Sequence, residues 1–237
     1  MTMRAPKWLS RIYQRNSRVH LALAPIRHGL VALRNLARPG DLHQAWGTTQ
    51  LNRRPKLMKA LSEIVRDEAG VKVLSFGCSS GEEVLDIRQY YRHATVFGTD
   101  LNRKSLKKAQ RLLRGTGVQL FVSTDENIQE HGPYTLIMAC SVFIRHPEDT
   151  HTDDISTLYP FEVFERGICR LFENTIVGGY LLIHNADYRV TDTRVGPRLR
   201  PVRHGELVQN PRVPLFARTG RKLGVTGYDE QLFRRES

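Results

Sequence analysis

The stretch VLSFGCSSGEEVLDI, residues 73–87, decides the fold. An apolar run rich in strand-forming residues stops at Gly77, passes small residues to Gly81 and continues into acidic, helix-like sequence. Glycine permits positive φ and lets a ligand approach the backbone closely. The turn is therefore either ordinary strand-to-helix punctuation or a place where the backbone is cleared for a ligand.

Strand-like and helix-like segments alternate on both sides of this turn, with short connections. That alternation predicts right-handed crossovers and an α/β, Rossmann-like, doubly wound parallel sheet with helices on both faces. The expected helices are 55–70, 82–93, 103–114 and 161–176, the last ended by Gly178-Gly179, and the expected strands are 71–76, 94–100, 118–124, 134–140 and 180–186.

The tail of the chain has a different pattern. Short strand-like runs at 205–210, 213–219 and 227–236 are separated by turns, and they predict a closing antiparallel hairpin that brings the sheet to seven strands. We therefore expect three parts: a basic helical extension at 1–54, a core at 55–190, and C-terminal strands at 191–237 that complete the sheet.

Charge is distributed unevenly along the 237 residues, whose formal net charge is +12. Residues 1–60 carry +11, residues 61–188 carry −5 and residues 189–237 carry +6. Basic ends suit nucleic acid, an anionic membrane surface or an acidic substrate, or they pair with the acidic middle. The first 40 residues, which hold no acid, also resemble an organellar transit peptide, although 19–40 reads as a helical unit of the fold.

Other classes of protein fit the composition poorly. The three cysteines, Cys78, Cys140 and Cys169, are too few and too scattered for a disulfide scaffold or a zinc site, so a cytoplasmic protein without a metal is expected. No apolar run is long enough to span a membrane.

Asp100 ends the second expected strand, 19 residues after Gly81. An acid at that place can accept hydrogen bonds from both ribose hydroxyls of a nucleoside. It can also cap the next helix, a role that Asn102 would fill equally well. The dinucleotide pattern G-x-G-x-x-G is broken by Ser79 and Glu82. Acids at the helix start oppose a pyrophosphate, so they favour a cationic nucleoside over NAD.

At this point the motifs resemble a known family. Four motifs, in this order, resemble those of class I S-adenosylmethionine-dependent methyltransferases. They are VLSFGCSSGEE, VFGTDLNRKSLKKA, YTLIMACSVFIRH and FENTIVGGYLLIHN. The resemblance spans roughly residues 55–190. It implies S-adenosyl-L-methionine as the cofactor and assigns cofactor contacts by position. Those residues are Gly77, Ser79 and Gly81 for the methionine portion, Asp100 for the ribose, Leu101 and Asp125 for the adenine, and Cys140 with Ser141 beneath the cofactor.

Two departures from the family pattern matter. Ser75 stands where many members carry an acid, and Glu82 or Glu83 is expected to supply that charge to the cofactor's ammonium group. GCSSGEE with GTDLN is closest to the chemotaxis-receptor glutamate methyltransferases. However, their Arg-Asn pair and Tyr are replaced here by Cys140-Ser141 and Arg145, which argues against receptor methylation.

We therefore expect transfer of a methyl group to a small-molecule metabolite, with protein glutamate methylation and RNA binding or methylation as alternatives. His146 is the candidate general base, because it follows the fourth strand and imidazole takes up a proton near neutral pH. The end of the fifth strand, at His184, Asn185, Asp187 and Tyr188, is a further candidate for contact with the acceptor. A loop containing His151, Asp153 and Asp154 could act as a lid.

The N-terminal extension is expected to cap the acceptor site. Trp8, Ile12 and Tyr13 alternate with basic residues there, so the segment either packs on the core or lies on an anionic membrane surface. The protein would then be cytoplasmic or peripheral at a membrane. No aromatic stacking platform supports a nucleic-acid partner, and the sequence gives no oligomeric state.

Overall fold

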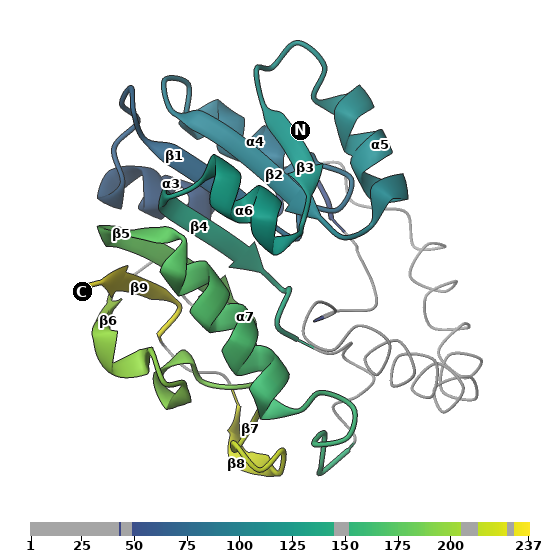
Figure 1. Ribbon diagram of the computed structural model, residues 1–237, viewed down its shortest axis with the longest axis vertical. Helices are drawn as coiled ribbons and strands as arrows, with labels where there is room; N and C mark the ends of the chain where they lie inside the picture. The colour runs from purple at the N-terminus through teal and green to yellow at the C-terminus, as the bar shows by residue number, and fades with distance from the viewer. Residues whose placement is uncertain (1–42, 44–48, 145–151, 205–212, 227–229) are drawn as a thin grey trace, which may run out of the picture.

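The computed structural model describes residues 43, 49–144, 152–204, 213–226 and 230–237. Seven strands form one sheet in the order β3-β2-β1-β4-β5-β9-β6 (Figure 1). The strands are β1 Lys72–Phe76, β2 Thr95–Asp100, β3 Gln119–Val122, β4 Tyr134–Cys140, β5 Thr175–His184, β6 Leu199–Val202 and β9 Leu232–Arg235. The expected Rossmann-like architecture is confirmed.

Strands β1 to β5 are parallel, because each is followed by a crossover that returns the chain to the same end of the sheet. β1 lies between β2 and β4, so the strand order reverses there. In doubly wound sheets such a reversal opens a crevice at the carboxyl ends of the strands. That places the turn after β1 and the end of β4 at the same edge.

Helices cover both faces of the sheet (Figure 1). On one face, α3, α4 and α5 pack on buried residues such as Val73, Val96 and Met138. On the other face, α6 and α7 pack on residues such as Leu74 and Ile137. The helices are α3 Pro55–Ile64, α4 Glu82–Tyr90, α5 Arg103–Leu112, α6 Asp125–His131 and α7 Phe161–Glu173, with single 3-10 turns η2 Val190–Asp192 and η3 Gly196–Arg198.

The C-terminal strands close the sheet as expected, although through partly different segments. β9 is antiparallel to both β5 and β6. β6 comes from 199–202, a segment that the sequence pattern did not mark. The run at 213–219 instead contributes β7 Pro214–Phe216, which pairs with β8 Lys222–Thr226 in a separate two-stranded sheet. The run at 205–210 lies outside the described residues.

The prediction that Gly178-Gly179 ends the helix at 161–176 is wrong. Helix α7 ends at Glu173, and both glycines lie inside β5. Gly178 has φ +81, a conformation that glycine adopts without strain. The pair therefore bends the start of a long strand instead of stopping a helix.

Among residues 1–48 the structure describes only His43, which is buried in the core. The imidazole of His43 packs 4.5 Å from the ring of Phe143, and its Nδ1 lies 2.9 Å from the hydroxyl of Tyr159. Helix α7 makes room for it with Gly167: a Cβ there would lie 2.6 Å from both His43 and Phe143. The remaining residues before Thr49 lie outside the described part, including Trp8, Ile12 and Tyr13.

Gly167→Ala is therefore expected to destabilise the protein. Alanine is the better helix former by about 1 kcal/mol, but overpacking a filled core costs about 1–3 kcal/mol. We expect a net loss of up to about 2 kcal/mol in the free energy of unfolding, measured by urea denaturation of the full-length chain. Gly224→Ala is the matched control, because a Cβ at Gly224 meets nothing within 4 Å. Equal midpoints for the two variants would show that His43 and Phe143 do not fill this space.

Candidate functional site

The turn after β1 has an unusual backbone. Gly77, Ser79 and Gly81 all have positive φ, at +76°, +50° and +95°. Thr99 of β2 accepts hydrogen bonds from the backbone N–H groups of both Gly77 and Cys78. Such alternation of left-handed residues turns successive N–H groups toward one side of the turn.

Each glycine is also required by the packing around the turn. A Cβ on Gly77 would lie 2.6 Å from a methyl of Val142, and one on Gly81 would lie 2.9 Å from the Cβ of Ala109 in α5. The glycines therefore clear space for the protein's own β4 loop and helix α5. This close approach does not by itself indicate a ligand.

Asp100 spans the turn and the start of α5. Its Oδ2 accepts a hydrogen bond of 2.8 Å from the N–H of Ser79, and its Oδ1 accepts one of 2.7 Å from the N–H of Asn102. Asn102 is the residue that caps α5, by accepting from the N–H groups of Lys104 and Ser105. Asp100 is therefore not the helix cap. A carboxylate has about four lone-pair positions, so Asp100 keeps acceptor capacity at the crevice.

Glu83, in the first turn of α4, lies beside Ser75, the position at which many members of the resembling family carry an acid. Its Oε1 accepts a hydrogen bond of 3.0 Å from the hydroxyl of Ser75 in β1. Glu82 points elsewhere and accepts from the hydroxyl of Ser80. Of the two acids left open by the sequence, Glu83 is thus the one that brings negative charge beside Ser75.

Burial raises the pKa of the Glu83 carboxyl, and the charge of Arg54 together with hydrogen bonds from Cys140 and Ser75 opposes that rise. Arg54 lies 3.4 Å from Glu83, and both side chains are only 13% exposed. Burial also raises the pKa of the Cys140 thiol, which Glu83 reinforces. The thiol is therefore protonated and is no candidate nucleophile.

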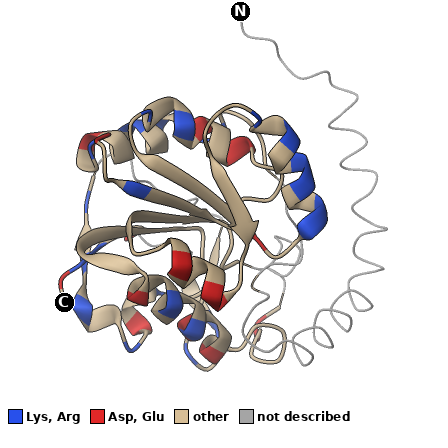
Figure 2. Ribbon diagram, turned by 45° about the horizontal axis from the view of Figure 1, so that its top comes forward, with Lys and Arg blue, Asp and Glu red and all other residues tan. Residues whose placement is uncertain are grey.

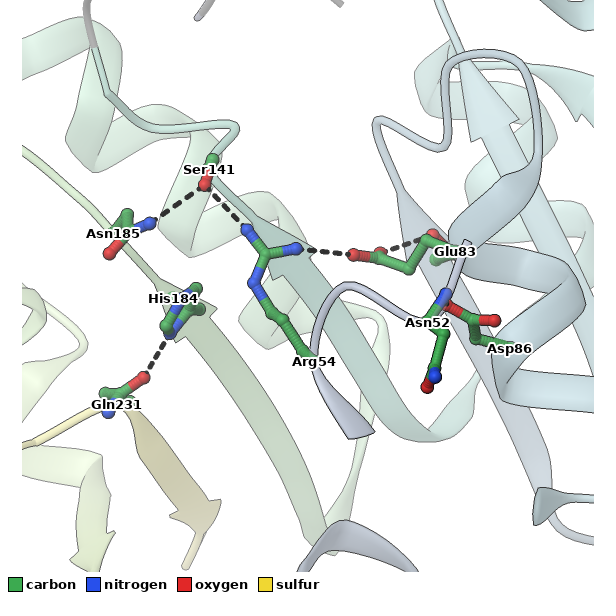
Figure 3. Close-up of polar contacts among 9 residues, drawn as sticks. Asn52, Arg54, Glu83, Asp86, Ser141, His184, Asn185 and Gln231 are labelled. Atoms are coloured by element: carbon green, nitrogen blue, oxygen red, sulfur yellow. Dashed lines mark hydrogen bonds and ion pairs between the residues drawn. The ribbon is translucent and has the colours of Figure 1, made fainter. Parts of the chain in front are cut away.

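Arg54 is a site residue that the sequence analysis missed. It donates from one nitrogen to Glu83 and from another, at 3.0 Å, to the hydroxyl of Ser141 (Figure 3). The N–H of Asn52 donates to Asp86 of α4 at 2.7 Å, which fixes the segment that carries Arg54. The available signal was an Arg53-Arg54 pair immediately before the proline that begins α3.

The ends of β4 and β5 bring further polar groups to the same edge. Ser141 donates its N–H to the carbonyl of His184 at 2.6 Å, and Asn185 donates its amide to the Ser141 hydroxyl at 3.0 Å. Both Ser141 and Asn185 have φ +58°. Residues other than glycine held in that region cluster at functional sites. Figure 3 shows Arg54, Ser141 and Asn185 in one connected set.

His184 hydrogen-bonds through Nδ1 to Oε1 of Gln231, which precedes β9. Burial lowers the pKa of His184 to about 4, the charge of Arg54 lowers it further, and the bond to Gln231 opposes this. His184 is therefore neutral near pH 7. Gln231 was not predicted, because nothing in the sequence indicates that it faces β5.

The remaining predicted residues are placed as follows. Leu101 is half-buried directly after β2. Asp125 begins α6, and its Oδ1 lies 2.5 Å from Nε of Arg170. His146 and His151 lie outside the described residues, so the structure does not test the predicted base.

Four other predicted residues make contacts that hold the fold together. They are Asp187, Tyr188, Asp153 and Asp154. Tyr188 is buried and donates its hydroxyl to the carbonyl of Tyr159, while Asp187 pairs through its backbone with Phe143 and Phe216. The backbone at 153–154 pairs with the β8 side of the small sheet. The lid stays a prediction, because the start of that loop lies outside the described residues.

The described part of the chain holds neither a metal cluster nor a membrane-spanning helix. No cluster of three or more His, Cys, Asp or Glu side chains is arranged to hold a metal ion there. Within the same residues, no helix is long and apolar enough to cross a membrane.

Comparison with known proteins gives one match to a family. Residues 73–158 match the sequence model of a family described as "Methyltransferase domain". No curated protein matches the sequence.

Solved structures overlap with the chain at low identity. TehB from Haemophilus influenzae is 16% identical, with a TM-score of 0.49 over 76% of this chain and 61% of its own. TrmN from Thermus thermophilus is 17% identical, with a TM-score of 0.41 over 54% and 36%. CalS10 from Micromonospora echinaspora, described as an amino pentose methyltransferase, is 14% identical, with a TM-score of 0.40 over 57% and 50%. The chain thus spans between about a third and three fifths of the length of these proteins.

The family match covers the glycine turn, Asp100 and the end of β4, which are the elements that build the site. Residues 73–158 are therefore similar to a methyltransferase domain, and class I enzymes with such a domain take their methyl group from S-adenosyl-L-methionine. The residues at the crevice fit that cofactor. Asp100 offers free acceptor positions, and Glu83 with Arg54 offers one charge of each sign.

Proposed function

We propose that this chain transfers a methyl group from S-adenosyl-L-methionine to a small-molecule metabolite. The observation that carries the proposal is the buried Glu83–Arg54 pair, which shares the crevice with Asp100. An amino-acid zwitterion needs one acid for its ammonium and one cation for its carboxylate. A ribose needs an acceptor for its hydroxyls. The three side chains supply all of these.

The cofactor contacts follow from these placements. Glu83 holds the ammonium, Arg54 the carboxylate and Asp100 the ribose. Around them, the turn of Gly77, Ser79 and Gly81 runs along the methionine portion, Leu101 and Asp125 lie at the adenine, and Cys140 and Ser141 lie beneath the cofactor. The sulfonium cofactor supplies the activated methyl group, and this chain's residues orient donor and acceptor and exclude water.

A recessed acceptor site favours a small acceptor over a protein or RNA strand. Asn185 and Gln231, at the end of β5 and before β9, are 8% and 1% exposed. Each leaves a buried polar atom, Asn185 Oδ1 and Gln231 Nε2, without a hydrogen bond in the described part of the chain. Buried polar atoms without partners are costly, and together they make the end of β5 a tightly enclosed polar region, which suits a small acceptor.

The N-terminal segment 1–54 completes this site in our proposal. His43 is fixed inside the core beside α7, and Arg54 reaches the crevice from the end of the segment. Both contacts support a cap that packs on the 55–190 core, while residues 191–237 supply β6 and β9 to the sheet.

One observation favours nucleic acid as a second candidate acceptor. Helix α5 and the residues after it carry six exposed cations and no acid, and Figure 2 shows these blue positions recurring along one helix. They are Arg103, Lys104, Lys107, Lys108, Arg111 and Arg114. A cationic face of this kind suits a phosphate backbone. However, α5 follows Asp100 and Leu101, which are proposed to contact the cofactor's ribose and adenine and not the acceptor.

A labelled-methyl experiment separates these possibilities. The full-length protein is first titrated with S-adenosylhomocysteine by calorimetry, and binding is expected. It is then incubated with methyl-labelled cofactor and a cell extract, which is separated into small molecules, protein and RNA. We expect label among the small molecules. Base-labile label in protein would indicate glutamate methylation, label in RNA would favour the second candidate, and a folded protein that does not bind S-adenosylhomocysteine would overturn the proposal.

A further inference from the structure

His184 ends β5, at the edge of the sheet where the proposed cofactor site lies. It pairs in register with Cys140 of the neighbouring strand β4. Side chains of residues paired across neighbouring strands point to the same face of a sheet. Cys140 is hydrogen-bonded to Glu83, so the face that His184 shares also carries the proposed ammonium-binding carboxylate.

The bond to Gln231 fixes which ring nitrogen of His184 carries the proton. An amide oxygen only accepts hydrogen bonds. Nδ1 must therefore donate to Gln231 Oε1, and the neutral ring carries its lone pair on Nε2. Within the described residues no other hydrogen bond reaches the ring, and Nε2 is not among the buried polar atoms that lack a partner. Nε2 is thus an accessible acceptor.

The surrounding charges keep this ring neutral. Arg54 and Arg53 approach from the segment before α3, and Gln231 approaches from the segment before β9. Glu83 of α4 is engaged by Arg54 and offers His184 no ion pair among the described contacts. A positive group arriving at this edge is repelled by both guanidinium groups. An acceptor that enters as an ammonium ion is therefore disfavoured.

We propose that the acceptor is a small-molecule hydroxyl, methylated on oxygen, and that Nε2 of His184 accepts its proton. This assignment rests on the proposed methyltransferase function and deepens it. In the step, the acceptor's O–H bond and the C–S bond of the sulfonium break and the O–C bond forms. Sulfur takes the C–S electron pair, Nε2 takes the proton, and the imidazolium releases it to water.

A weakly basic imidazole such as that of His184 can act as the general base for a hydroxyl acceptor. A free hydroxyl holds its proton tightly, but the proton becomes strongly acidic as oxygen bonds to the methyl group. A base of intermediate strength takes the proton during that change. The same base is too weak to deprotonate an ammonium ion, so it offers nothing to a protonated amine. The hydroxyl of Ser141, which accepts a hydrogen bond from the amide of Asn185 at the same edge of the sheet, suits a neutral hydroxyl-bearing molecule.

The tautomer is tested without any acceptor. The full-length protein is labelled with ¹⁵N-histidine, and His184→Gln identifies the His184 signals in the spectrum. We expect the Nδ1–H tautomer at pH 7, with the ring remaining neutral down to about pH 4. Gln231→Leu should abolish the preference for that tautomer. An Nε2–H tautomer, or protonation close to the ordinary histidine value of about 6.5, would overturn the assignment of His184.

The acceptor class is tested with ¹³C-methyl cofactor and a metabolite extract, because the chemical shift of a methyl carbon separates oxygen from nitrogen and sulfur attachment. We expect an O-methyl product. His184→Gln should lower its formation at least about 100-fold without changing the affinity for S-adenosylhomocysteine.

His93→Gln is the matched control for this loss. His93 is exposed just before β2, at the opposite edge of the sheet, and the substitution should have no effect on product formation. An N-methyl or S-methyl product, or full activity of His184→Gln, would overturn the inference while leaving methyl transfer intact. A wild-type protein that fails to bind S-adenosylhomocysteine would instead overturn the proposed function, and the tautomer measurement would still decide the state of His184.

Discussion

Replacing Asp100 with alanine is expected to lower the affinity for S-adenosylhomocysteine at least about 100-fold. A hydrogen bond to a charged group contributes about 1.5–3 kcal/mol, and the carboxylate is proposed to accept one from each ribose hydroxyl. Two such bonds correspond to about two to four orders of magnitude in the dissociation constant. Asp100 also holds the N–H of Ser79 at 2.8 Å, so the turn loses its anchor.

Calorimetry with two ligands tests this expectation. 5′-Methylthioadenosine keeps the adenosine of S-adenosylhomocysteine and lacks its amino-acid end. Because Asp100 is assigned to the ribose, Asp100→Ala should weaken both ligands by similar factors. Asn102→Ala is the matched control in the same loop: it removes the cap of α5, at a cost of about 1 kcal/mol in stability, and keeps the carboxylate. Unchanged affinity in Asp100→Ala would show that the ribose assignment is wrong.

The sequence was most informative where periodicity was strong. The five parallel strands and four of the helices follow from apolar runs whose burial the structure confirms. Helix α6 was missed because its seven residues bury only Ile128. β6 was missed because LRPV contains a proline and an arginine, which a strand at the sheet edge tolerates. β8 has largely exposed side chains, so no alternation of burial marks it.

The candidate site likewise contains residues that the sequence pattern could indicate and residues that it could not. Asp100 and Glu83 follow strand β1 or β2 at intervals that the doubly wound fold fixes, and the sequence pattern could therefore indicate them. Arg54 and Gln231 come from segments before α3 and β9, and their places depend on how distant parts of the chain pack. The positive φ that the turn was expected to need is confirmed at Gly77 and Gly81. Part of the reason for these glycines lies in Val142 and Ala109, which only the tertiary structure brings close.

The pairing of Glu83 with Arg54 has a consequence for ligand selection. In the protein alone the two charges neutralise each other in a largely buried position. A ligand with only one charge would leave the opposite protein charge uncompensated, and burying an unpaired charge is costly. An amino-acid zwitterion offers a partner to each. In the proposed site, the pair would therefore select for a complete amino-acid end and discriminate against nucleosides that lack it.

Glu83→Gln is expected to lower the affinity for S-adenosylhomocysteine about 10- to 100-fold and to leave the affinity for 5′-methylthioadenosine unchanged. The amide keeps the size of the side chain and can still accept from Ser75. It cannot attract an ammonium group, and the loss of one charge-assisted hydrogen bond is about 1.5–3 kcal/mol. The pattern thus differs from that of Asp100→Ala, which weakens both ligands.

Glu82→Gln supplies the matched control, because Glu82 is the neighbouring acid in the same helical turn and engages Ser80 instead of Ser75. It should leave both affinities unchanged. If Glu83→Gln weakened the two ligands equally, Glu83 would act by shaping the glycine turn. If Glu82→Gln produced the selective loss, the charge beside the ammonium would come from the other acid. Only a loss confined to Glu83 and to the ligand with an amino-acid end agrees with a carboxylate that replaces, from helix α4, the acid missing at Ser75.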